Sequence, residues 1–490
     1  MAILPSRLRS REQEDWGDER QGFREMLEDP VAFARGVLGQ SLWWRQEEIL
    51  GDLTRHRRVA VKACHASGKT RLAAVATLWW LLRYPDGIVV TTAPTWPQVT
   101  KLLWGEIRTA VASLNLPIDL PAPNTTELTL GPGNYAMGLS TNEGVRFQGF
   151  HGRLLFAVDE GPGVRPDIYE AIEGARAGGD VAVLVVGNPM ARGGPFVDAF
   201  TGRGARNWAR HTISAFDTPN LVTLGATQDE RLARLLEMPD AELDLESRPY
   251  LTRRRWVREK FHEWGPGHPL WEAKVLGKFP GQADDALFAL SDLHAAQFRD
   301  VGIPDGAPWR AGLDVAGPGE DETALCIRHG DQIALLESWT KADPRQEVLD
   351  ALLPYREKGV DVVCDADGIG YYMARHLQDH GLRITDVHVG TPAGEPGRFS
   401  NLKAELYWNL RLHLEQGRIG GLTDELAIGQ LATVLYDHNT KGQIVIESKD
   451  KLRTRGQKSP DRAEAVILAF AESAILPLGP VNLDRELSFI

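Results

Sequence analysis

The sequence has few cysteines and no long apolar run. Its 490 residues include 3 cysteines, Cys64, Cys326 and Cys364, which lie far apart. Because they form no CxxC pair, neither a zinc site nor a disulfide framework is expected. No stretch reaches the ~18 consecutive apolar residues that a membrane helix needs. The charged N-terminal segment also lacks the apolar core of a signal peptide, so we expect a protein of the reducing cytoplasm.

Basic charge is scarce as well. The chain carries 55 lysines and arginines against 67 acidic residues, which gives a net charge of −12. Phosphate binding, however, depends on local rather than total basic charge. Two clusters are locally basic: Arg253, Arg254 and Arg255 with Arg258 and Lys260, and the segment 449–458. Each is compatible with a nucleic-acid contact or with ordinary solvated surface.

Short β-like runs alternate with helical patterns in a first block, residues 35–220. The runs lie at 59–63, 88–92, 154–158 and 181–186, and a clear helical pattern spans 70–83. Strands that alternate with helices predict a parallel sheet covered on both faces. The first block is therefore expected to be an α/β domain with a parallel-type central sheet.

A second block of the same kind begins near residue 308. Its β-like runs lie at 311–315, 323–328, 332–337 and 360–364, and helical patterns follow at 371–379, 401–416 and 461–474. Strands first and mixed elements later predict a smaller, mixed α/β domain. The expected organisation is an N-terminal extension (1–34), the first domain (35–220), a linking subdomain (221–305), the second domain (306–475) and a tail (476–490).

Residues 63–70, ACHASGKT, follow a β-like run and open a helix, which is the context of a P-loop. Backbone N–H groups around Ser67 and Gly68 would cradle phosphate oxygens at the helix N-terminus. Lys69 would reach the β- and γ-phosphates, and the Thr70 hydroxyl would bind Mg²⁺. Ala63 stands where the usual pattern has glycine. The alternative is an ordinary structural turn.

A second motif, LLFAVDE, places two acids at the end of an apolar run. Asp159 suits Mg²⁺, bound directly or through water, and Glu160 suits a general base that orients the attacking water. Either acid could instead belong to a turn that ends the strand. The presence of both motifs in one α/β block favours a nucleotide site that uses ATP and Mg²⁺.

Four further residues fit an ATPase in position. Gln46 lies upstream of the P-loop, where an adenine-reading glutamine is expected, and Asn188 ends the run at 181–186, where a γ-phosphate sensor is expected. Arg146 could be an arginine finger, and Lys62 could stabilise charge within the same chain. Each of the four could equally have a structural role.

The second block supplies separated carboxylates. Asp314 and Asp365 each end a β-like run, and Asp461 and Glu464 share one face of the last predicted helix. Metal-dependent phosphodiester cleavage needs several carboxylates around two Mg²⁺ or Mn²⁺ ions roughly 4 Å apart. The alternative is that these acids form turns and a helix capping box. Two neighbouring acids, Asp321 and Asp367, receive no role.

The order of the motifs WWRQ, VKACHASGKT, TTAPTWPQV, FQGFHG, LLFAVDE and VVGNP resembles the ATPase of the large terminase subunits of tailed bacteriophages. The acidic segments RAGLD, DVVCDADGIG and KSPDRAEA resemble the ribonuclease-H-like nuclease of the same family. The resemblance implies ATP-driven translocation of double-stranded viral DNA into a procapsid, and a two-metal endonuclease that cuts concatemeric DNA. Many members carry aspartate where this chain has Glu464, which puts ion spacing and metal preference in doubt.

The resemblance also implies partners: a portal protein, a terminase small subunit and, when docked, a homo-oligomeric ring in the host cytoplasm. One alternative is a DNA helicase or repair nuclease with the same two modules. A helicase would need a second RecA-like domain after residue 220, and the sequence offers no second set of strands there. Another alternative is a non-catalytic assembly protein that binds a portal.

Overall fold

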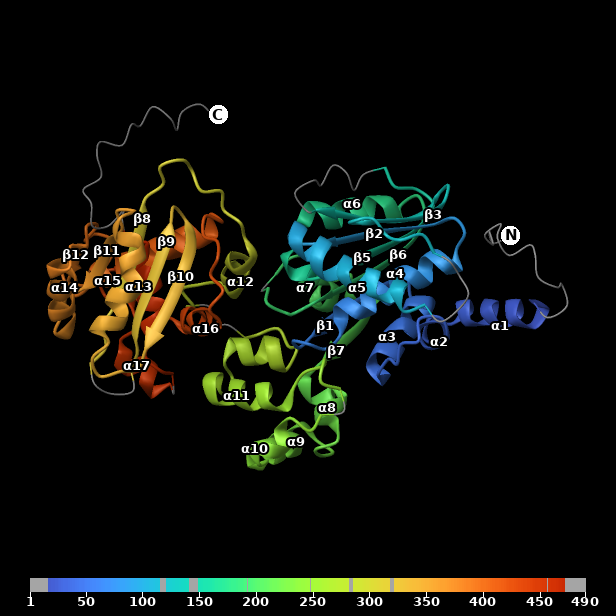
Figure 1. The fold of residues 1–490 in the computed structure, drawn as a ribbon, viewed down its shortest axis with the longest axis horizontal. Helices are drawn as coiled ribbons and strands as arrows, with labels where there is room; N and C mark the ends of the chain where they lie inside the picture. Colours follow the sequence, from blue (N-terminus) through green and yellow to red (C-terminus); the bar gives the residue numbers. More distant parts are fainter. Residues whose placement is uncertain are drawn as a thin grey trace. The chain divides into compact units, whose positions relative to one another are not determined.

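The computed structural model describes residues 16–114, 120–140, 149–191, 193–246, 248–281, 285–317, 321–455 and 457–471 (Figure 1). The chain forms two compact units that divide between Pro280 and Gly281. Most of the predicted linking subdomain, residues 221–280, falls in the first unit, and its remainder falls in the second. The finer domain boundaries stay predictions. None of the helices in the described ranges is long and apolar enough to cross a membrane.

The first unit contains a seven-stranded sheet in the order β3-β4-β2-β5-β6-β1-β7. All neighbouring strands pair in parallel except β3 and β4, which confirms the predicted parallel-type sheet. The strands are β1 (Arg58–Ala63), β2 (Gly87–Ala93), β3 (Glu127–Gly131), β4 (Asn134–Ser140), β5 (Arg153–Val158), β6 (Asp180–Gly187) and β7 (Ala209–Ile213).

Helices cover both faces of this sheet. The chain passes from β1 to β2 through α4 (Lys69–Arg83) in one direction along the sheet, and from β5 to β6 through α6 (Pro166–Arg176) in the other. Right-handed crossovers in opposite directions place the two helices on opposite faces, as Figure 1 shows. The side chains of α6 and α7 (Pro195–Thr201) complete one apolar core around Phe156.

The remaining helices of the first unit lie before the P-loop, after β2 and after the sheet. Those before the P-loop are α1 (Trp16–Glu28), α2 (Pro30–Gly36) and α3 (Trp44–Arg55), and α5 (Trp104–Ala112) follows β2. Those after the sheet are α8 (Pro219–Val222), α9 (Gln228–Glu237), α10 (Asp240–Leu243) and α11 (Arg254–Trp264).

The second unit contains a five-stranded mixed sheet in the order β10-β9-β8-β11-β12. The strands β8, β9 and β10 are antiparallel, and β8, β11 and β12 are parallel, as predicted for a mixed α/β domain. Their bounds are β8 (Trp309–Asp314), β9 (Thr323–His329), β10 (Gln332–Trp339), β11 (Asp361–Asp365) and β12 (Arg383–Val387).

Seven helices and a short hairpin accompany the second sheet in the described ranges. The helices are α12 (Leu290–Phe298), α13 (Arg345–Arg356), α14 (Ile369–Asp379), α15 (Leu402–Glu415), α16 (Glu425–Thr433), α17 (Lys449–Thr454) and α18 (Asp461–Ala469), and the hairpin is β13 (Tyr436–His438) with β14 (Ile444–Ile446). The last helix was predicted to run to residue 474, but a turn ends it after Ala469, and the Arg328 guanidinium Nε donates to Ala469 O at 2.6 Å.

Helix α18 lies directly against β8 at Gly312. A Cβ atom at Gly312 would overlap the backbone atoms Ala465 O and Ala469 N of the helix. Only glycine allows this approach, because the side-chain volume of any other residue is already filled by backbone. The contact holds the first turn of α18 beside the last residue of β8, Asp314.

The substitution Gly312→Ala should therefore force α18 away from the sheet. We expect overpacking to lower the free energy of unfolding of the second unit by about 1–3 kcal/mol. Chemical denaturation followed by circular dichroism would measure it. Gly397→Ala is the matched control, because nothing lies within 4 Å of a Cβ at that position. Equal stability of the two variants would contradict the role of the close contact.

Candidate functional sites

The loop between β1 and α4 is held in place by backbone hydrogen bonds within the first unit. Cys64 N donates to Ile213 O at 2.8 Å, and His65 N donates to Lys274 O at 2.8 Å. Two loop residues have positive φ angles, Ala66 at 53° and Gly68 at 82°. The loop thus has the fixed, strongly turned backbone that a phosphate cradle requires.

The predicted catalytic residues meet at the carboxyl ends of adjacent parallel strands. Lys69 Nζ lies 3.0 Å from Glu160 Oε1 and donates to Asn188 Oδ1 at 3.1 Å. The Thr70 hydroxyl donates to Asp159 Oδ2 at 2.9 Å. Because β1, β5 and β6 are neighbours, residues that follow them share one edge of the sheet. The structure therefore brings all five of these residues together.

Burial and mutual repulsion shape the electrostatics of this edge. Burial and the nearby Glu160 carboxylate raise the pKa of Asp159 to about 6. Burial opposes the charge on Lys69, but Glu160 and Asp159 raise its pKa above the ordinary value. Glu160 itself has a left-handed backbone, with φ at 48°. Strained backbone of this kind concentrates at functional sites.

A cavity of about 480 Å³ opens over the loop, a size that suits a nucleotide. Its lining includes Lys69, Thr70 and Ser67, and the Ser67 hydroxyl is buried with no hydrogen-bond partner among the described residues. Gln46 also lines it, but the side chain is only 4% exposed. Its Nε2 donates to Gly68 O at 3.0 Å, so Gln46 supports the loop, and adenine reading stays a prediction.

The two candidates for a charge-stabilising cation are Arg146 and Lys62. Arg146 lies outside the described residues. The Lys62 ammonium lies over the rings of Phe279 and Phe200, at 4.8 and 5.5 Å from their centroids. Burial and the neighbouring Lys278 lower the pKa of Lys62. Its role toward a nucleotide stays a prediction.

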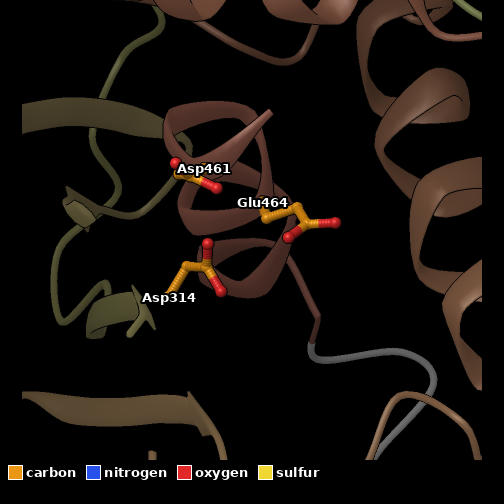
Figure 2. Close-up of side chains that lie close together, drawn as sticks. All are labelled: Asp314, Asp461 and Glu464. Atoms are coloured by element: carbon orange, nitrogen blue, oxygen red, sulfur yellow. The ribbon is translucent and has the colours of Figure 1, made fainter. Parts of the chain in front are cut away.

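The second unit gathers carboxylates at one edge of its sheet. Asp314, Asp461 and Glu464 each offer an oxygen atom within 4.8 Å of the others. Figure 2 shows Asp461 and Glu464 on the first turn of α18, with Asp314 facing them from β8. Asp365 ends the neighbouring parallel strand β11 and lines the same small pocket as Asp314 and Glu464.

The sequence offered Asp365 and Asp461 alike as metal ligands, and the structure places Asp461 in the tight group. Asp461 does not cap its own helix. Its carboxylate accepts from Glu322 N at 2.8 Å and from the Ser459 hydroxyl. Gly370 allows α14 to approach β11, because a Cβ there would overlap Asp365 O.

Three side chains that the sequence did not single out for this site surround Glu464. Lys449 Nζ lies 2.6 Å from Glu464 Oε2, and Lys403 Nζ and the Tyr407 hydroxyl donate to Oε1 at 2.9 and 3.0 Å. The spacing of Lys403 and Tyr407 on one face of a predicted helix was the only available signal. Lys449 had been assigned to the basic segment at 449–458 as a whole.

These lysines favour the charged form of Glu464. Burial raises the pKa of Glu464, but Lys403 and Lys449 outweigh it and hold the pKa below the ordinary value. Burial and the negative charge of Glu464 raise the pKa of Asp314 well above its ordinary value. A buried carboxylate with a raised pKa, next to others, is stabilised by a divalent cation, since the cation supplies the missing positive charge.

The two acids without a predicted role have partners outside the tight group. Asp367 Oδ1 lies 2.7 Å from His388 Nδ1, and Asp367 N donates to Asp365 Oδ1 at 3.2 Å. Asp321 Oδ2 accepts from Arg453 at 3.2 Å. Asp367 therefore orients Asp365, and Asp321 belongs to a surface ion pair.

Comparison with known proteins adds one full-length relative. No family model matches the chain. A protein of Enterobacteria phage P7, described as "Probable terminase, large subunit", is 23% identical over 476 residues, covering 90% of each chain. The resemblance to large terminase subunits is confirmed.

Solved structures of large terminases are similar at low sequence identity. The large terminase of bacteriophage HK97 is 15% identical, with a TM-score of 0.39, covering 91% of this chain and 99% of that chain. A nuclease domain of the large terminase subunit of bacterial virus Sf6, a mutant solved with manganese, is 18% identical, with a TM-score of 0.33, covering 38% of this chain and 98% of that chain.

The cluster of Asp314, Asp461 and Glu464 should destabilise the fold when no cation is bound. Because the pKa of Asp314 is raised, its stabilising contribution is present at low pH and is lost as pH rises. Asp314→Asn should therefore stabilise the chain at pH 7 in EDTA, on the order of 1 kcal/mol. The gain should shrink as pH falls through the raised pKa of Asp314, and it should be smallest well below 3.8, the ordinary pKa, where the carboxyl is protonated in both states.

Divalent cations should reverse the order of stability of the wild-type chain and Asp314→Asn. Mn²⁺ should raise the melting temperature of the wild-type chain and have a much smaller effect on Asp314→Asn. Differential scanning fluorimetry in EDTA and in Mn²⁺ would measure both effects. The exposed Asp305→Asn is the control and should behave as wild type. An equal rise in melting temperature with Mn²⁺ for the wild-type chain and for Asp314→Asn would remove Asp314 from the cation site.

Proposed function

We propose that this chain hydrolyses ATP to translocate double-stranded viral DNA into a procapsid and cuts the DNA with a two-metal endonuclease. The observation that supports it best is the presence of two separate sites in one chain. The first unit holds a P-loop with Lys69 and Glu160 in contact, and the second holds three closely grouped carboxylates, of which Asp314 and Asp461 are buried and Glu464 is half-buried. The relatedness to large terminase subunits supports the same function.

In the proposed ATPase, the loop backbone and Lys69 bind the phosphates. Thr70 and Asp159 already lie within hydrogen-bond distance and would hold a magnesium ion, which neutralises charge on the phosphates. Glu160 would then orient the attacking water, because phosphate binding draws Lys69 away from it. Asn188 bonds both Lys69 and the loop carbonyl Ala63 O, so it is placed to sense the γ-phosphate.

In the proposed nuclease, Asp314, Asp365, Asp461 and Glu464 would hold two divalent cations. The cations supply an activated water and stabilise the leaving oxygen. Glu464 is now held by Lys403, Lys449 and Tyr407. These contacts orient its longer side chain, so the family's aspartate is not needed to fill this position.

Arginines of both basic clusters pair with acids, and the clusters differ in that only the second reaches the carboxylate site. In the first, Arg253 and Arg255 pair with Asp244 at 2.8 Å, and Arg258 pairs with Asp240. This cluster stabilises the fold around α11. The segment at 449–458 includes helix α17 and carries Lys449 into the carboxylate site. We infer that this segment guides the DNA backbone to the cations.

The same proposal includes the partners of a packaging motor. These are a portal protein, a terminase small subunit and further copies of this chain in a ring, in the cytoplasm of the host. The proposed role of Arg146 is to reach a nucleotide held by a neighbouring copy. The helicase alternative is disfavoured, because the second sheet of the described residues is mixed and carries carboxylates rather than a second P-loop.

Replacing Glu160 by glutamine should separate nucleotide binding from turnover. Glu160→Gln should bind ATP and lose hydrolysis by about 100-fold or more, because the water loses its base. Lys69→Ala should weaken both. A coupled ATPase assay and calorimetric binding would measure them, with the exposed Glu170→Gln as control. Hydrolysis by Glu160→Gln at the wild-type rate would remove the base assignment.

Nuclease activity should depend on the strand-end acids. Asp314→Asn and Asp365→Asn should each abolish linearisation of plasmid with Mn²⁺ and leave the ATPase rate unchanged, because the two sites lie in separate units. Glu464→Asp should remain active, with an altered preference between Mg²⁺ and Mn²⁺. Asp305→Asn is again the control. Plasmid cleavage by both asparagine variants at the wild-type rate would show that these acids are structural.

A further inference from the structure

Tyr250 is an exposed aromatic residue at the nucleotide cavity, and no sequence motif pointed to it. Tyr250 lines the same cavity as Lys69 and Thr70, yet 57% of it is exposed. The exposed ring, beside Lys69 and Thr70 in the cavity lining, is available to contact a ligand. A role for Tyr250 in binding the base rests on the proposed nucleotide site.

The segment that carries Tyr250 is bonded to the phosphate loop itself. Thr252 N donates to Ala66 O at 3.0 Å, and the Thr252 hydroxyl donates to His65 O at 2.6 Å. Buried Asn220 fixes the segment from behind, because its Nδ2 donates to Arg248 O and Thr252 O. The ring is therefore held at a set place relative to the loop, as a preformed binding surface requires.

Two arginines flank the ring. Arg248 donates to the Tyr250 hydroxyl at 2.7 Å and also to Ser41 Oγ at 3.1 Å, which anchors the polar end of the ring. The Arg71 guanidinium lies 5.7 Å from the ring centroid. Its Nε is buried with no hydrogen-bond partner among the described residues, and Glu106 Oε2 is 3.7 Å away. The Arg71–Glu106 ion pair holds the guanidinium beside the ring.

The lining of the cavity thus combines two kinds of chemistry. Lys69, Thr70 and the loop backbone offer positive charge and N–H donors, which suit phosphates. Tyr250 and Arg71 offer a flat ring and a planar cation, which suit the π-face of a nucleobase. A nucleoside triphosphate has both features in one molecule, and inorganic phosphates have only the first.

We propose that Tyr250 stacks on the base of the bound nucleoside triphosphate, with the Arg71 guanidinium against the same stack. Stacking depends on the ring face and tolerates different bases. Tyr250 therefore sets the affinity for nucleotides over base-free phosphates, and it does not choose between adenine and guanine. The Tyr250 hydroxyl is dispensable for stacking, since its contact is with Arg248.

The test compares a nucleotide with a ligand that lacks the base. Calorimetry with magnesium and the β,γ-imido analogue of ATP should show about 10-fold weaker binding to Tyr250→Ala than to the wild-type chain. Inorganic tripolyphosphate should bind both equally, which also shows that the variant is folded. Tyr250→Phe should bind the analogue as the wild type does, and the GTP analogue should lose affinity by the same factor.

The control is Tyr372→Ala, another exposed tyrosine, in the second unit, which should bind both ligands as the wild type does. Undiminished binding of the ATP analogue to Tyr250→Ala would overturn the proposal. An equal loss for tripolyphosphate would overturn it as well, because Tyr250 would then act through the shape of the loop. If the wild-type chain bound neither ligand, the nucleotide site itself would be wrong, which is a different result from either.

Discussion

Partly buried carboxylates that pair with lysines are the constraint on which both units depend. Lys69 pairs with Glu160 at the edge of the first sheet, and Lys403 and Lys449 pair with Glu464 at the edge of the second. Such charges are tolerated in a protein interior only when paired and hydrogen-bonded. Each pair therefore has to form at the edge where the strands end, and in the second unit both partners come from helices, α18 with α15 and α17, that meet at that edge.

The same constraint explains why backbone packing is so close around the second site. Asp314 and Asp365 are contributed by parallel strands, but Asp461 and Glu464 come from a helix that must reach them. A helix normally packs about 10 Å from a sheet, and side chains fill the space. Gly312 removes that layer at one point, so the first turn of α18 comes within reach of a strand-end aspartate. The site thus depends on a missing side chain as much as on the four acids.

The elements that carry strong patterns were predictable from the sequence, and those set by long-range contacts were not. The apolar strands β1, β2, β5 and β6 and the helix α4 were predicted, whereas β7 was missed because its residues, ARHTI, are largely polar. The strand-end acids of both sites were found because they follow apolar runs, and Asp461 and Glu464 were found because they share one face of the last helix. Lys403 and Tyr407 were not found, since their spacing on one helix face does not reveal that α15 faces Glu464. The position of Asp461 in the tight group depends on Glu322 N, which is also remote in sequence.

The region after the first sheet looks like a linker in its composition, but its hydrogen bonds tie it to the phosphate loop. Residues 221–280 looked like a charged connection, yet they supply Thr252 and Lys274, whose backbone groups bond Ala66 and His65 of the phosphate loop. A sharply turned loop exposes backbone donors and acceptors that must find partners when buried. The helices of the first domain leave these groups unpaired, so the following segment must fold back to pair them. The phosphate loop and this segment consequently form one structural element, and a shift of the loop on its ligand has to displace the segment that carries Tyr250 and α11.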